Sequence, residues 1–128
     1  MRRMFIALSA AAFVLALAAP SFAKVETVKG QLIDQGCYKM NKANTTDRHQ
    51  MPKGPVDNCA TACAKDGHGV ALLTSDGKIY EITGDLAANK NEKLVGHMTH
   101  TVEVTGDVTT AGDGAMKIAG ASLKMVSR

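Results

Sequence analysis

All three cysteines of this 128-residue chain lie in one polar stretch, Asp34 to His68. The stretch reads Asp-Gln-Gly-Cys-Tyr, then a polar loop, then Cys-Ala-Thr-Ala-Cys, and it also holds two of the four histidines. The segment that follows it has the pattern of an ordinary small-domain scaffold. The fold must therefore present one long loop that carries nearly all the reactive side chains, and the sequence predicts a thiol-based site there.

The N-terminus has the three parts of a secretory signal peptide. Met1–Arg3 is basic, Met4–Ala19 is apolar, and Ser21–Ala23 is a small-x-small cleavage site. The apolar run has 16 residues, fewer than the ~20 that a membrane helix needs. We therefore expect residues 1–23 to be removed, the mature protein to be periplasmic or secreted, and no membrane span to remain after cleavage.

The mature chain, residues 24–128, has the size of a single domain. Without Arg2 and Arg3 it carries 13 basic and 12 acidic residues, so its net charge is close to zero. Its aromatic residues are Tyr38 and Tyr80. A chain with neither a basic patch nor stacking platforms is not expected to bind nucleic acid.

Hydrophobic patterning predicts a mainly β domain. Five segments have the alternation or the apolar content of strands: 25–34, 69–74, 79–83, 99–107 and 116–125. Asp76-Gly77 favours a hairpin turn, Gly120 is a candidate bulge, and Asp85–Leu94 has the pattern of a short helix. Five strands with a helix between the third and the fourth follow the order of the OB-fold, a small Greek-key barrel. An open five-stranded sheet or another small barrel is the alternative.

The long loop is expected to contain one short helix of about two turns. Asp57 is a favourable N-cap residue for a helix over Asn58–Lys65, and Gly67 is a natural stop. Such a helix places Cys59 and Cys63 at positions i and i+4, on one face.

Four motifs give the mature chain a resemblance to a group of small exported bacterial proteins with an OB-like barrel, most of them uncharacterised. The motifs are Asp34-x-x-Cys37-Tyr38, Cys59-Ala60-x-x-Cys63-Ala64-x-x-Gly67, Asp76-Gly77-Lys78-x-Tyr80 and Val102-x-Val104-Thr105-Gly106. The cysteine pattern is the specific part. The resemblance implies a fold and a location, and it implies no activity.

The cysteine pattern favours a soft-metal site. Thiolate ligands with a histidine select copper(I) or zinc(II). The candidate ligands share this loop, and they are Cys37, Cys59, Cys63, His49 and His68. Met40 and Met51 lie in the same loop and would suit copper. A covalent c-type haem is not expected, because it needs C-x-x-C-H and Ala64 follows the second cysteine here.

Two other uses of the cysteines stay open. Cys37 could form a disulfide with Cys59 or Cys63 and staple the loop to a barrel that binds a small ligand or a periplasmic protein partner. The thiols could instead serve a redox protein. No nucleophile motif accompanies them, so the sequence does not favour an enzyme. If His97 and His100 lay on the fourth strand they would point to opposite faces, so they are not counted as a metal pair.

Overall fold

The computed structural model describes residues 24–128, so the predicted signal peptide lies outside the described residues. The strands are β1 (Lys24–Asp34), β2 (His49–Met51), β3 (Gly54–Val56), β4 (Val70–Leu73), β5 (Ile79–Thr83), β6 (Thr101–Thr110) and β7 (Met116–Ser127). The helices are α1 (Gln35–Met40), α2 (Cys59–Lys65), the 3-10 helix η1 (Gly84–Ala87) and α3 (Ala88–Val95). None of the helices within residues 24–128 has both the length and the hydropathy of a membrane span.

Five strands close into a barrel in the order β1-β4-β5-β7-β6, which confirms the predicted OB-like fold. Strand β1 closes it, because Lys24–Gln31 pairs with β6 and Gln31–Asp34 pairs with β4. The β5–β7 pair is parallel and the other pairs are antiparallel. Each barrel strand therefore has partners on both sides, so the barrel sheet has no open edge.

The barrel interior holds the expected core. Leu72, Ile82, Val104 and Ile118 are buried together, and Val28 packs against them. The bulge predicted at Gly120 is present, since the β6–β7 register shifts where Gly106 faces Gly120. A Cβ on Gly120 would lie 2.6 Å from Leu86 Cδ1, so the glycine makes room for η1 to pack onto the barrel.

The helix predicted over Asp85–Leu94 is present only in altered form. The segment divides into η1 and α3, and Asn89, Lys90 and Asn91 at the start of α3 have left-handed backbone angles. Asparagine tolerates this conformation better than most residues do. Asn91 is buried and uses the turn to reach helix α2, as described below.

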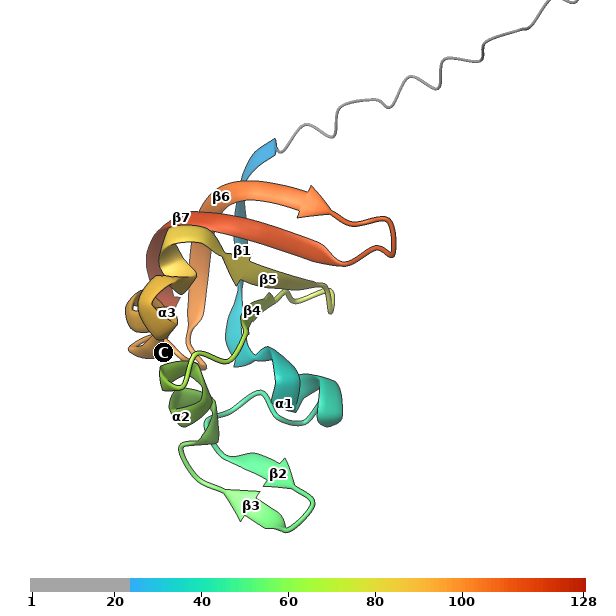
Figure 1. Cartoon of the computed structure of the whole chain (residues 1–128), viewed down its shortest axis with the longest axis vertical. Coiled ribbons are helices and arrows are strands. Elements are labelled where there is room, and N and C mark those ends of the chain that lie inside the picture. The colour runs from blue at the N-terminus through green and yellow to red at the C-terminus, as the bar shows by residue number, and fades with distance from the viewer. Residues whose placement is uncertain (1–23) are drawn as a thin grey trace, which may run out of the picture.

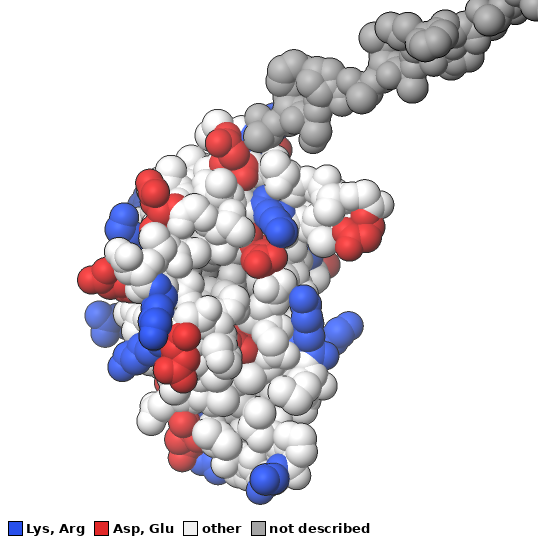
Figure 2. Space-filling model, in the orientation of Figure 1, with Lys and Arg blue, Asp and Glu red and all other residues white. Residues whose placement is uncertain are grey.

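The predicted loop between the first two barrel strands has more structure than the sequence indicates. It contains α1, a β2–β3 hairpin and α2, and Figure 1 shows these elements gathered at one end of the barrel. On the face shown in Figure 2, acidic and basic side chains are interspersed over the described residues. This face therefore presents no broad positive area for a polyanion.

Candidate metal centre

Cys37 is held by the end of barrel strand β1. Asp34 is the last residue of β1 and the N-cap of α1, and its Oδ1 accepts a hydrogen bond of 2.7 Å from the Cys37 N–H. This is the usual N-cap interaction, in which a side-chain oxygen satisfies a free amide of the first turn. Cys37 is buried. The barrel therefore fixes the position of the first thiol directly.

Cys59 and Cys63 lie one turn apart in α2, as predicted, but the predicted N-cap is wrong. Asp57 does not cap the helix, because it lies on the surface and pairs with Arg48 at 3.1 Å. Asp47 takes this role: its carbonyl accepts from the Cys59 N–H at 2.7 Å, and its Oδ1 accepts from the Thr61 N–H at 2.8 Å. A residue brought close by the folded loop thus satisfies the free amides of α2.

The C-terminus of α2 ends in a Schellman motif. The His68 N–H donates to the Cys63 carbonyl, the Gly67 N–H donates to the Ala64 carbonyl, and Gly67 has a φ of +89°. Asn91 Nδ2 also donates to the Ala64 carbonyl at 2.9 Å and to the His68 carbonyl at 2.8 Å. These bonds fix the backbone of His68 next to Cys63.

Asn44 joins α1 to the β2–β3 hairpin. It is fully buried, its Nδ2 donates to the Cys37 carbonyl at 3.1 Å, and its Oδ1 accepts from the Gln50 N–H at 2.7 Å. Sequence reasoning missed the structural roles of Asn44, Asp47 and Asn91. Each lies in a polar segment where asparagine and aspartate are common, so no local signal separates them from surface residues.

The three cysteines converge as the sequence predicted. The sulfur atoms of Cys37, Cys59 and Cys63 lie within 4.8 Å of one another, and all three thiols are free. Three sulfur atoms that bind the same metal ion, each at about 2.3 Å, lie about 4 Å from one another. The cluster, called here the three-thiol site, is therefore compact enough to hold a metal ion.

Burial keeps two of these thiols protonated in the metal-free protein. It is the largest cause that raises the pKa of Cys63, to about 11, and the negative charge of Asp34 acts in the same direction. Burial and the adjacent Asp34 carboxylate also raise the pKa of Cys37 well above its ordinary value. Thiols with raised pKa values are weak nucleophiles near neutral pH.

The two predicted histidine ligands have different positions. His68 is exposed, and one of its ring nitrogens lies within 4.8 Å of both Cys63 Sγ and an Asp34 carboxylate oxygen. His49 is completely buried in β2, and neither of its ring nitrogens has a hydrogen-bond partner within residues 24–128. His49 does not belong to either cluster of potential ligands in the described part of the chain.

The two loop methionines line a cavity whose lining contains none of the cysteines. Met40 and Met51 line a shallow cavity of about 300 Å³ between α1 and the hairpin, and Met40 is exposed. His97 and His100 lie before β6 rather than on it, with ring centroids 6.4 Å apart. The condition under which they would point to opposite faces, a place on the strand, is therefore not met.

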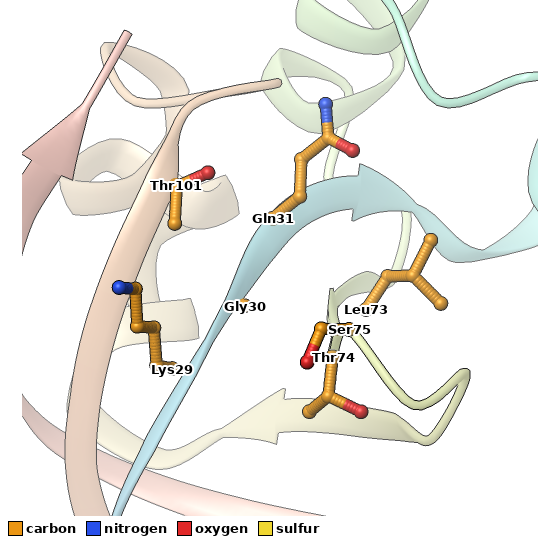
Figure 3. Close-up of a pocket in the computed structure, with 7 residues that line it drawn as sticks. All are labelled: Lys29, Gly30, Gln31, Leu73, Thr74, Ser75 and Thr101. Carbon is orange, nitrogen blue, oxygen red and sulfur yellow. The ribbon is translucent and has the colours of Figure 1, made fainter.

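A larger cavity of about 410 Å³ lies on the side of the barrel. Lys29–Gln31, Leu73–Ser75 and Thr101 line it (Figure 3). It forms where β1 changes its pairing from β6 to β4. The cavity is open to solvent, and its lining has one charged side chain, Lys29, among mostly polar and small residues. The three-thiol site carries the more specific chemistry.

Comparisons with known proteins do not assign this site. No protein family, curated protein or solved structure matches the chain. The resemblance to exported OB-like proteins therefore stays a prediction.

Proposed function

We propose that this is an exported protein that binds a soft metal ion, copper(I) or zinc(II), through Cys37, Cys59 and Cys63. The observation that carries the proposal is the convergence of three free sulfur atoms from two separate helices. Thiolates are the preferred ligands of both ions. Copper(I) is satisfied by three thiolates, whereas zinc(II) requires a fourth ligand to complete its tetrahedron.

The local environment favours metal binding over redox exchange by the cysteines. The raised thiol pKa values of Cys37 and Cys63 disfavour the thiolate that redox exchange requires. A bound cation reverses this balance, because it stabilises thiolates that burial and Asp34 otherwise destabilise. A disulfide between two of the three cysteines would remove the site, so metal binding requires the reduced form.

Metal uptake should release protons. The Cys37 and Cys63 thiols are neutral near pH 7, and their raised pKa values keep them neutral to higher pH than an ordinary thiol. Each must lose its proton to bind. We expect the reduced protein to bind one copper(I) or zinc(II) per chain with release of about two to three protons. Affinity should therefore fall as the pH falls.

The measurement is an anaerobic titration against a competing chelator, repeated at several pH values, with proton release followed in a weak buffer. A chain fully alkylated at cysteine is the control and should take up no metal. A reduced protein that takes up no metal at micromolar concentration would refute the proposal. An affinity that does not depend on pH would also contradict it.

The location is tested separately. The signal pattern predicts that exported protein begins at Lys24 and accumulates outside the cytoplasm. Intact-mass measurement of material from the extracytoplasmic fraction should give the mass of residues 24–128. A mass that includes residues 1–23 would contradict cleavage, and protein confined to the cytoplasm would contradict export.

A further inference from the structure

A second group of potential ligands lies beside the three-thiol site and shares one residue with it. We propose that Asp34, Cys63 and His68 form a second metal position, the outer position, which takes a divalent cation of the zinc class. A carboxylate oxygen, the Cys63 sulfur and a His68 ring nitrogen lie within 4.8 Å of one another. The proposal goes beyond the three-thiol site and does not require that site to be filled.

Asp34 has a free oxygen for this purpose. Its Oδ1 is occupied as the N-cap of α1 by the Cys37 N–H. Asp34 is only 1% exposed, and its Oδ2 is buried without a hydrogen bond of normal geometry within residues 24–128; the Cys37 thiol is the neighbouring donor beside this carboxylate. A buried carboxylate oxygen without a partner is costly. A cation in the outer position would satisfy it.

Three hydrogen bonds hold the backbone at His68 and Gly69. The His68 N–H donates to the Cys63 carbonyl, and the His68 carbonyl accepts from Asn91 Nδ2. The next residue, Gly69, accepts from the Gln35 N–H at 2.9 Å, which ties this turn to the start of α1. The His68 side chain is exposed on a fixed backbone, so it can bind an arriving ion with little loss of backbone entropy.

The donor set selects the cation. One carboxylate oxygen, one thiolate and one imidazole match the mixed ligands of zinc(II), and the two negative charges balance a divalent ion. Copper(I) prefers sulfur and has little affinity for carboxylate, so it suits the three-thiol site better. Three protein ligands leave one tetrahedral position open to solvent. Cys63 is common to both positions, so filling one alters the other.

The test isolates the outer position in a double variant, Cys37→Ser/Cys59→Ser. Cobalt(II) serves as the probe, because it replaces zinc(II) and shows a thiolate charge-transfer band. We expect the folded double variant to bind one cobalt(II) with the band intensity of a single cobalt–sulfur bond. Adding His68→Ala to this background should weaken binding at least about tenfold. Adding Lys65→Ala, on an exposed residue of α2, is the matched control and should leave binding unchanged.

Two results would overturn the proposal. One is a folded double variant, judged by an unchanged circular dichroism spectrum, that binds no cobalt(II) at micromolar concentration. The other is equal affinity with and without His68. If the double variant does not fold, nitrogen-15 NMR of the unsubstituted reduced chain gives the answer. Up to two equivalents of zinc(II) should shift the His68 ring nitrogens and leave those of His97 unshifted, and an unshifted His68 would refute the outer position.

The failure of this proposal can be distinguished from the failure of the proposed function. The double variant lacks two of the three cysteines of the three-thiol site, so its cobalt(II) signal reports the outer position alone. Copper(I) binding by the His68→Ala single variant reports the three-thiol site alone. Loss of either signal with retention of the other identifies which position is absent.

Discussion

Replacement of any one of the three cysteines by serine should weaken copper(I) binding by at least about a hundredfold. Each of Cys37, Cys59 and Cys63 supplies one sulfur to a cluster within 4.8 Å, and a serine hydroxyl is a poor ligand for a soft ion. The loss of copper(I) affinity should be similar for the three variants, since all three sulfurs are needed as ligands. Competition with a copper(I) chelator under anaerobic conditions measures each affinity.

The control for this series is Ala62→Ser. Ala62 lies in α2 between Thr61 and Cys63 and is exposed, so an added hydroxyl there should leave both affinity and stability nearly unchanged. Denaturation of the metal-free variants separates ligand loss from unfolding. A structural disulfide would produce a different pattern, in which two serine variants lose stability equally and the third is silent. That two-plus-one pattern with unchanged copper(I) affinity would contradict the metal site.

Gly106→Ala should reduce the free energy of unfolding by about 3 kcal/mol. Gly106 is buried in β6 opposite Gly120, where the register of the β6–β7 pair shifts. A Cβ at this position would lie 2.7 Å from the carbonyl carbon of Ala119 and closer still to its oxygen. Both atoms belong to the backbone of β7, so only a displacement of the strand can relieve the clash.

Urea denaturation of the metal-free protein measures this effect, and Gly112→Ala is the matched control. Gly112 is exposed in the turn between β6 and β7, and a Cβ there would have no neighbour within 4 Å. Its free energy of unfolding should stay within about 0.5 kcal/mol of the unsubstituted protein. Equal denaturation midpoints for the two variants would show that the β6–β7 pair can relax around a side chain at Gly106.

The barrel could be predicted because its signals are local. Strand alternation places Val104 and Ile118 on the inner face of their strands, and a short apolar run marks the strand that holds Leu72. The Asp76-Gly77 turn reverses the chain between β4 and β5. The spacing of Cys59 and Cys63 likewise predicts a shared helical face. Each of these inferences depends on residues that are close together in the chain.

The interactions that assemble the loop could not be predicted in this way. Asp57 has the local pattern of an N-cap, yet Asp47 performs the function because the hairpin brings it to the start of α2. Asn91 bonds to the last turn of α2, although strands β4 and β5 lie between the two in the sequence. His49 shares the loop with the cysteines but lies outside both ligand clusters of the described residues.

The sequence by itself determined the mainly β class and the strand order, because side-chain periodicity and turn chemistry act over a few residues. It also placed the three cysteines in one loop. The tertiary structure decided which donors meet. The ligand atoms of Asp34, Cys63 and His68 lie within 4.8 Å of one another although Asp34 is far from the other two in the chain. Their positions depend on the closed barrel, the hydrogen bonds of Asn44 and the buried amide of Asn91. No short-range pattern encodes such distances, because they arise only when all these elements pack together.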